Sequence, residues 1–225
     1  MKIDLSKLTA TTKLTRLIAG YFQNLHDVTC NQKYANTLPY SFHLDNVYRW
    51  ATAYRQYWLT DPFTYLKVYI GIYGHDSIED ARLTFNDIVN LDKHLIAYDA
   101  SAESIITKLC ADLAISYQDW RCILADAAEI IYACSEEKGR NREERHSDKF
   151  YDDLIKNELA VFVKLCDLIA NSTFSLNQNG SMFVKYKTEF TKSHNKLLSN
   201  SNLDKFSPMY NFLSSIYNLH FNLSL

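Results

Sequence analysis

The segment YLKVYIGIYGHDSIED, residues 65–80, decides how this chain is interpreted. Its first ten residues are almost all apolar or aromatic, and its last six include one histidine and three carboxylates. A continuous apolar run of this kind predicts a helix that is buried around most of its circumference. We therefore expect a helix over residues 63–80 that ends in a group of polar side chains inside the protein.

The composition favours helices throughout. The chain has 225 residues, 47% of them hydrophobic and 22% charged, as in ordinary soluble globular proteins. Only 5 Gly and 3 Pro are present, and this scarcity of turn residues argues against a sheet-rich fold. No segment shows a convincing strand alternation. We predict an all-α protein with a single domain, residues 1–225, whose core spans about 35–190 and whose C-terminal helical extension spans about 182–225.

Apolar residues at helical spacing predict the remaining elements. A short helix is expected after Thr84, which can cap it. Polar loops are expected at 29–41, 135–153 and 171–181. The other predicted helices are 4–25, 42–57, 101–115, 118–135, 150–171, 182–198 and 207–221.

Charge and cysteine usage exclude several classes of function. A net charge of −2 provides no basic field for DNA or for a membrane surface. We find no apolar stretch as long as a membrane span and no secretory signal at the N-terminus. Five cysteines are scattered without a CxxC pair, so we expect reduced core residues in a cytoplasmic protein, with a disulfide or a cysteine–metal site as the minor alternative.

A second apolar helix carries its own polar stripe. Residues 159–170 are apolar nearly all round except for Lys164 and Asp167, and Asn171 follows. The spacing i, i+3, i+7 places these three side chains on one face of a helix. A buried carboxylate without a partner is costly, so Asp167 should meet a cation, a metal or several hydrogen-bond donors.

Two apolar helices that each carry acids predict a shared polar pocket. His75, Asp76, Glu79 and Asp80 fall on one side of about one helical turn. A divalent cation would relieve the repulsion among these carboxylates, and imidazole with carboxylate suits Mn, Fe or Zn. His43, at the start of another predicted helix, adds a third region.

This order of residues is the pattern of the HD-domain superfamily: a first His, an adjacent His-Asp pair, then a distant Asp. HDSIED (75–80) resembles the HDxxED motif of the RelA/SpoT-type alarmone hydrolases, PYSFH (39–43) resembles their PYxxH, and VKLCDLIAN (163–171) is similar to their VKLADRLxN. EEKGRNREERHSDKFY (136–151) and GSMFVKYKTEF (180–190) resemble small single-domain members from bacteria and phages. The resemblance covers roughly residues 35–190 and implies a helical HD domain.

The resemblance also implies roles for individual residues. Glu79 and Asp80 match the acidic pair that positions or deprotonates the attacking water, and Asn171 matches an Asn that contacts the nucleotide. The metal, typically Mn²⁺ in the alarmone branch, would lower the pKa of water and polarise a phosphoryl oxygen. The four implied metal ligands are His43, His75, Asp76 and Asp167.

The chain departs from the alarmone pattern at one place. Tyr34 and Ala35 stand where those hydrolases usually carry a Lys and an Arg, of which the Arg stacks on guanine. Tyr34 can stack on a base instead. In addition, Leu168 stands where the family often has Arg.

Further substrate contacts are proposed with their alternatives. Lys164 is either a substrate contact or the partner of a nearby acid. Tyr186 and Lys187 most simply belong to an ordinary helix face. Four basic residues are candidate phosphate ligands, although neighbouring glutamates could instead make them a solvated charged loop: Lys138, Arg140, Arg142 and Arg145.

The leading hypothesis is therefore a metal-dependent phosphohydrolase that removes pyrophosphate from a nucleotide such as guanosine polyphosphate, ppGpp. One alternative is another HD activity, a 5′-nucleotidase or a deoxynucleotide triphosphatase. A second is a nucleotide-binding module without turnover. A homo-oligomer is compatible with each of them.

Overall fold

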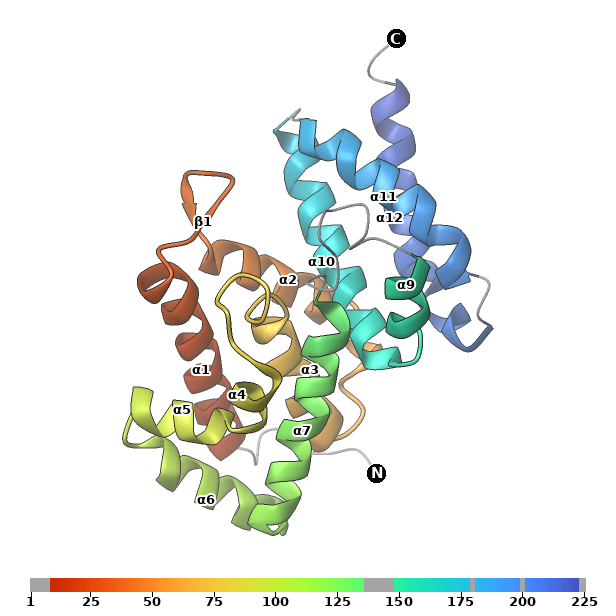
Figure 1. The fold of residues 1–225 in the computed structure, drawn as a ribbon. Coiled ribbons are helices and arrows are strands. Elements are labelled where there is room, and N and C mark those ends of the chain that lie inside the picture. Colours follow the sequence, from red (N-terminus) through yellow and green to blue (C-terminus); the bar gives the residue numbers. More distant parts are fainter. Residues whose placement is uncertain (1–8, 136–147, 179–180, 199–200, 223–225) are drawn as a thin grey trace.

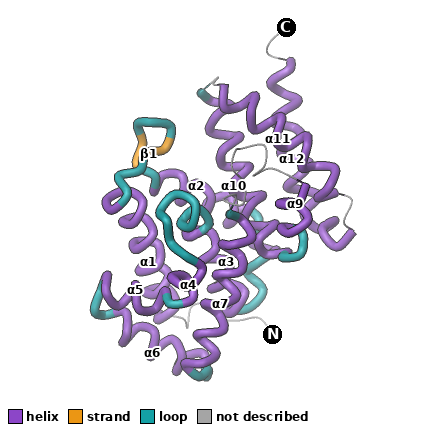
Figure 2. Tube along the Cα trace, viewed as in Figure 1, coloured by secondary structure: helices purple, strands orange, loops and turns teal. Residues whose placement is uncertain are grey.

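Helices make up most of the structure, a computed structural model that describes residues 9–135, 148–178, 181–198 and 201–222 (Figures 1 and 2). The predicted all-α fold is confirmed. Short segments of other helix types lie at η2 (Leu25–Thr29), η3 (Arg55–Tyr57) and η4 (Ser201–Phe206). The α-helices are α1 (Thr9–Asn24), α2 (Ser41–Ala53), α3 (Pro62–Gly74), α4 (Phe85–Val89), α5 (Leu91–Tyr98), α6 (Ala102–Leu113), α7 (Tyr117–Cys134), α9 (Asp148–Leu154), α10 (Glu158–Asn177), α11 (Ser181–Leu198) and α12 (Ser207–Asn222).

Helix α3 lies at the centre of this arrangement and packs against α7, α1, α2 and α10 (Figure 1). Its side chains from Val68 to Tyr73 are buried, as the apolar run predicts. Two glycines let α7 approach closely: a Cβ on Gly71 would lie 2.7 Å from Ile130, and one on Gly74 would lie 2.5 Å from Ile131. This close packing fixes the end of α3, from which the polar segment continues.

The end of α3 differs from the prediction. The helix ends at Gly74, so residues 75–80 form successive turns and the predicted helix over 63–80 is too long. The Ser77 hydroxyl donates to the carbonyl of Gly74 at 2.6 Å, which supplies a partner at the end of the helix. The Asp80 amide still donates to the Asp76 carbonyl at 2.8 Å, so the helical spacing of the polar side chains is partly kept.

The predicted helix over 150–171 is two helices, α9 and α10. The break lies before Asn157, whose side chain accepts from the Ala160 amide and caps α10. Helix α10 then runs to Asn177, through the predicted polar loop. The hydroxyls of Ser172, Thr173 and Ser175 donate to carbonyls four residues earlier, so this polar sequence satisfies itself within a helix.

Helix α10 also corrects the expectation about membrane spans. By length and composition it is apolar enough to cross a membrane. In the structure 67% of that apolar window is buried among other elements, and it packs against α2, α7, α11 and α12. Its apolar character is that of a core helix, which brings Asp167 into the interior.

A small hairpin occupies the predicted loop 29–41. Strands β1 (Lys33–Tyr34) and β2 (Leu38–Pro39) pair antiparallel, with Lys33 opposite Pro39 and Tyr34 opposite Leu38. They are orange in Figure 2. Ala35 and Asn36 turn the chain with φ of 49° and 67°. The hairpin matters because it holds Tyr34 against α2 and α10.

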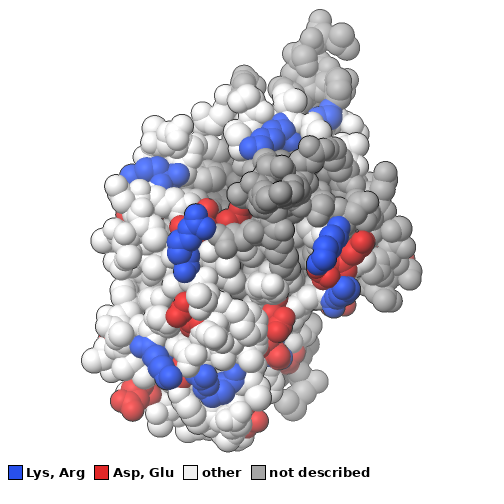
Figure 3. All heavy atoms as spheres, viewed as in Figure 1, with Lys and Arg blue, Asp and Glu red and all other residues white. Residues whose placement is uncertain are grey.

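The surface charge agrees with the composition, whereas only three of the five cysteines lie in the core, where all five were expected. On the face in Figure 3, Lys and Arg side chains lie among Asp and Glu, as expected for a net charge of −2. All five cysteines are free: Cys110, Cys134 and Cys166 are buried, and Cys30 and Cys122 are exposed.

Candidate metal centre

Three separate elements bring two histidines and two aspartates together. His43 comes from the first turn of α2, His75 and Asp76 follow α3, and Asp167 lies in the middle of α10. The two imidazole Nε2 atoms are 3.3 Å apart. Asp76 Oδ2 lies 2.9 Å from His75 Nε2 and 3.4 Å from His43 Nε2. Asp167 Oδ1 lies 3.3 Å from His43 Nε2 and 3.7 Å from His75 Nε2.

These residues fit a divalent cation. The donor atoms of His43, His75 and Asp76 all lie within 4.8 Å of one another. Two donors bound about 2.1 Å from one ion, at right angles, are about 3 Å apart, close to the separations seen here. His75 Nδ1 lies 2.8 Å from the Ile72 carbonyl and donates to it, which fixes the direction of the ring. Nε2 therefore points into the cluster, where it could bind a cation once it has lost its own proton.

The charges in the cluster stabilise one another. Burial alone would lower the pKa of His43 and of His75, but the two aspartates outweigh it and raise both values. Burial would raise the pKa of Asp76, yet the charge of His75 and hydrogen bonds from both imidazoles hold it well below its usual value. Burial is likewise outweighed at Asp167, where Lys164 and the histidines keep the pKa far below its usual value. The carboxylates are therefore ionised, as metal ligands must be.

A second layer of side chains orients the aspartates. Tyr40 donates to Asp76 Oδ2. Asn171 donates to Asp167 Oδ1 at 2.6 Å, and Lys164 lies 3.3 Å from Asp167 Oδ2. This confirms that the i, i+3, i+7 stripe of α10 forms one connected group. Partners of this kind fix the direction of metal ligands and raise their affinity.

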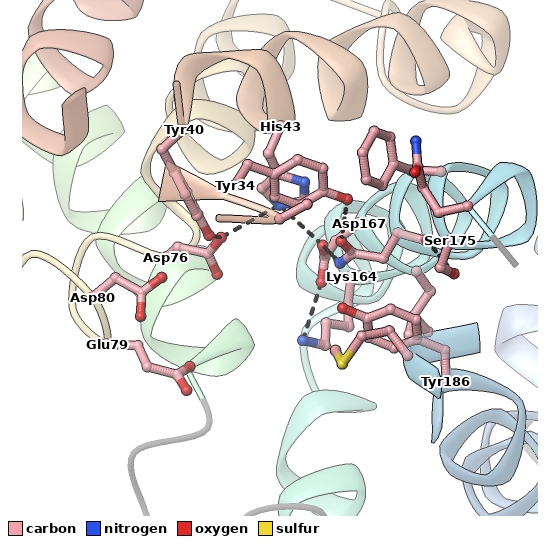
Figure 4. A pocket seen from close by; sticks show the side chains of 16 residues that line it. Tyr34, Tyr40, His43, Asp76, Glu79, Asp80, Lys164, Asp167, Ser175 and Tyr186 are labelled. Atoms are coloured by element: carbon pink, nitrogen blue, oxygen red, sulfur yellow. Dashed lines mark hydrogen bonds and ion pairs between the residues drawn. The ribbon is translucent and has the colours of Figure 1, made fainter. Parts of the chain in front are cut away.

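The cluster lies in the wall of a cavity of about 450 Å³ (Figure 4). That size suits a small organic ligand. Glu79 and Asp80, the predicted water-activating pair, line the same cavity, as do Lys164 and Asn171. Helices α10 and α11 also contribute apolar and aromatic side chains to the lining, Leu168, Phe174, Met182 and Tyr186, together with the polar Ser175 and Gln178.

A chain of two hydrogen bonds through Gln32 holds Asp80, and the sequence did not predict it. Gln32 donates from Nε2 to Asp80 Oδ2 at 2.6 Å, and its Oε1 lies 2.6 Å from Nδ1 of the buried His26. The His26 ring stacks on Tyr40 with centroids 4.7 Å apart. Burial, followed by the charge of Asp76, raises the pKa of Asp80. A carboxylate with a raised pKa beside a metal cluster is suited to accept a proton.

Tyr34 reaches the site from the hairpin. Its ring stacks on His43 with centroids 4.9 Å apart and planes 18° from parallel. Its hydroxyl donates to Asn171 Oδ1 at 2.9 Å. The centroid of the Phe174 ring lies 4.8 Å from the centroid of the Tyr34 ring. Tyr34 thus contacts two residues predicted from the sequence, one as a metal ligand and one as a nucleotide contact.

The predicted site residues are divided by the structure into two groups. Lys138, Arg140, Arg142 and Arg145 lie outside the described residues. The other predicted site residues either line one cavity or lie directly behind its wall. The sequence did not predict four residues that belong to the site or support it: Tyr40, Gln32, Phe174 and Met182. Of these, only Tyr40 had a signal in the sequence, its place in PYSFH. Tyr186, expected on an ordinary helix face, lines the cavity.

No family model, no curated protein and no solved structure matches this chain.

Proposed function

We propose that the protein is a metal-dependent phosphohydrolase of the HD type that acts on a nucleotide. One observation carries the proposal: two imidazole Nε2 atoms and two ionised carboxylates converge in the wall of a cavity that also contains Glu79 and Asp80. The motif order His43, His75–Asp76, Asp167 supports the same conclusion. Perturbed ionisable groups tend to gather at functional sites, and phosphoryl transfer to water uses histidines and acids that hold a metal ion.

In this proposal each residue has a role that follows from its position. His43, His75, Asp76 and Asp167 hold one divalent cation, for which Mn²⁺ is the first candidate. When bound, the cation lowers the pKa of water and neutralises charge on a phosphoryl group. Lys164, close to Asp167 and on the cavity wall, adds a positive charge beside the same phosphate.

In this proposal Glu79 and Asp80 orient and deprotonate the attacking water. Both line the cavity next to Asp76, and neither belongs to the imidazole cluster itself. Asp80 is fixed by Gln32 and has a raised pKa, so it is the better candidate for the proton acceptor. Glu79 then orients the water. Asp80 would accept the proton of the attacking water as the water oxygen bonds to phosphorus and the bond from that phosphorus to the leaving-group oxygen breaks.

The leading substrate is a nucleotide with a pyrophosphate ester, as in the alarmones, because HDSIED and VKLCDLIAN resemble that branch. The test is release of pyrophosphate, phosphate or triphosphate from a panel of nucleotides with Mn²⁺, Co²⁺ or Fe²⁺. We expect pyrophosphate from guanosine polyphosphates. Phosphate from nucleoside monophosphates would indicate a 5′-nucleotidase, and triphosphate would indicate a deoxynucleotide triphosphatase. No turnover with any metal would overturn the proposal.

One observation favours the alternative substrates. The alarmone pattern uses an Arg to stack on guanine, and here Tyr34 occupies that part of the chain and stacks on His43. This difference makes a different base or a different phosphate pattern the second candidate, and the same panel of nucleotides tests it. A binding module without turnover is distinguished by Asp80→Ala, which would leave the cellular function of such a module intact.

A further inference from the structure

The cavity has two chemically different halves. Asp76, Glu79 and Asp80 lie on one side of the view in Figure 4, Lys164 and Asp167 lie in the middle, and Tyr186 and Ser175 lie on the other side. We propose that the half formed by α10 and the first turns of α11 is a subsite for the nucleobase. This proposal rests on the proposed function, because it places the phosphates of the same ligand at the metal cluster.

The apolar half has the surface that a planar ring requires. Met182 and Tyr186 are spaced i, i+4 on α11, so they share one face of that helix, and both line the cavity. Met182 is 41% exposed, so part of its side chain is open to a ligand in the cavity. A flexible thioether beside aromatic rings adapts well to a flat ligand. Leu168 and Phe174 complete the apolar wall from α10.

Tyr34 is not available as the main stacking surface. Its ring already packs on His43, with Phe174 beside it, and its hydroxyl is bonded to Asn171. A base that replaced these contacts would have to displace a ring from a predicted metal ligand. A base on the α11 side of the cavity would leave the Tyr34–His43 stack in place, so this side is the better site for the base.

The length of the cavity also suits a nucleotide. Asp167 and Phe174 are seven residues apart on α10, which corresponds to about 10 Å along the helix. A ribose with one or two phosphates can bridge such a separation. Beyond Phe174 the cavity is lined by Ser175 and Gln178. Ser175 donates its hydroxyl proton to the Asn171 carbonyl at 2.8 Å, so its oxygen remains an acceptor, and the Gln178 amide supplies both kinds of group for a base edge.

The experiment compares ligands that differ only in the base. Binding of the four common nucleoside monophosphates and of ribose 5-phosphate is measured by calorimetry with Mn²⁺ present. We expect at least one nucleotide to bind about 10-fold more tightly than ribose 5-phosphate, since stacking of one base on aromatic side chains has that magnitude. Met182→Ala and Tyr186→Ala should reduce this ratio towards one and leave ribose 5-phosphate binding unchanged.

Val184→Ala is the matched control. Val184 lies between the two test positions on α11, is 61% exposed, and is not among the cavity-lining residues. It should keep the wild-type ratio, and thermal unfolding of each variant checks that the fold is intact. Equal affinity of wild-type protein for ribose 5-phosphate and for every nucleotide would overturn the subsite. So would an equal loss of both ligands in the Met182 and Tyr186 variants, or no binding of any nucleotide.

This experiment can fail or succeed independently of the proposed function, because it measures binding of the base and not turnover of a substrate. A clear preference for a nucleotide without hydrolysis of any substrate would keep the subsite and reject the phosphohydrolase. Hydrolysis of a phosphate ester with no dependence on the base would keep the enzyme and reject the subsite.

Discussion

The Tyr34 ring lies flat against the imidazole of His43, with centroids 4.9 Å apart. His75 is held by a hydrogen bond from Nδ1 to the Ile72 carbonyl, whereas His43 Nδ1 has no partner among the described residues. Metal-binding histidines are usually fixed by a hydrogen bond at the second nitrogen. We infer that the stacked Tyr34 ring takes over this positioning role for His43.

Replacing Tyr34 should therefore weaken metal binding. Tyr34→Ala removes the stacked ring and lets the imidazole rotate, and we expect about a 10-fold loss of Mn²⁺ affinity, the lower end for such supporting partners. Tyr34→Phe keeps the ring, loses only the bond to Asn171, and should bind Mn²⁺ almost as wild type does. Titration calorimetry with Mn²⁺ measures both. Unchanged affinity in Tyr34→Ala would remove this role from Tyr34.

Metal binding should also stabilise the fold. The candidate ligands come from α2, α10 and the turns after α3, so one bound ion would link three elements. At a free Mn²⁺ concentration about 100 times the Kd, a ligand bound only by the folded state adds about 2.7 kcal/mol to the free energy of unfolding. Differential scanning fluorimetry should show a rise in Tm that EDTA reverses.

Asp167→Asn is the variant that tests this assignment. It should abolish the Mn²⁺-dependent rise in Tm, because the amide is a poorer ligand than the ionised carboxylate. Asp112→Asn serves as the control: Asp112 pairs with Lys108 on α6 and is not part of the cluster, so the Mn²⁺ response should remain. A full response in Asp167→Asn would exclude Asp167 as a ligand.

Gly74→Ala should destabilise the protein at the end of α3, next to the candidate metal ligands His75 and Asp76. The added Cβ would lie 2.5 Å from Ile131 Cδ1 and 3.0 Å from the Phe22 ring. Overpacking of this kind costs about 1–3 kcal/mol. Adding Ile131→Val removes the nearest atom and should restore part of the loss, as chemical denaturation will show.

Gly20→Ala provides the comparison in α1. Its Cβ would meet only the end of Tyr98, at 3.3 Å, so a small change or a gain of up to about 1 kcal/mol in the free energy of unfolding is expected. Equal stability of the Gly74→Ala and Gly20→Ala proteins would contradict the close packing of α3 on α7.

The cap of α3 predicts a pH dependence of stability. Burial would raise the pKa of Asp61, but hydrogen bonds from Thr64 and from the Phe63 amide outweigh it and lower the value. A lowered pKa in the folded state means that the stabilisation is present above the unfolded pKa of about 3.9 and is lost as pH falls. The free energy of unfolding should therefore decrease below about pH 4.

Two variants isolate this contribution. Asp61→Ala removes the cap and should cost about 1 kcal/mol at neutral pH. Asp61→Asn can still accept the amide hydrogen bonds but cannot titrate, so the difference in stability between it and wild type should shrink as pH falls from 6 towards 3. A difference that grows over that range would contradict the sign of the shift.

Local periodicity explains what the sequence could predict. Lys164, Asp167 and Asn171 interact because helical spacing alone places them on one face. The apolar run before His75 is buried because it is apolar on all sides of the helix. The end of α3 and the continuation of α10 beyond Asn171 were predicted wrongly, because hydroxyl groups there satisfy backbone carbonyls in ways that composition does not show.

Contacts between distant segments could not be predicted. Tyr34 and Asn171 are 137 positions apart, and their hydrogen bond depends on a hairpin whose strands have two residues each. No alternation is visible in so short a strand. The hydrogen bonds through Gln32 could not be predicted either, since a half-buried loop glutamine has no pattern that links it to Asp80.

That chain of hydrogen bonds gives the last prediction. Gln32 can donate to Asp80 only if its Oε1 faces His26, so the Nδ1 of His26 must carry the proton. Burial also lowers the pKa of His26, which favours the neutral ring. Gln32→Ala frees the Asp80 carboxylate, and we expect kcat to fall about 10-fold or more, since small displacements of catalytic groups have large effects.

The same variant should leave Mn²⁺ affinity unchanged, because Gln32 contacts none of the metal ligands through its side chain. This combination separates a positioning role from general damage to the site. Gln23→Ala is the matched control: Gln23 donates to Asp45 at 2.8 Å, away from the cavity, and its loss should not alter kcat. A parallel loss of kcat and Mn²⁺ affinity in Gln32→Ala would mean that Gln32 supports the whole cluster and that Asp80 is not its particular target.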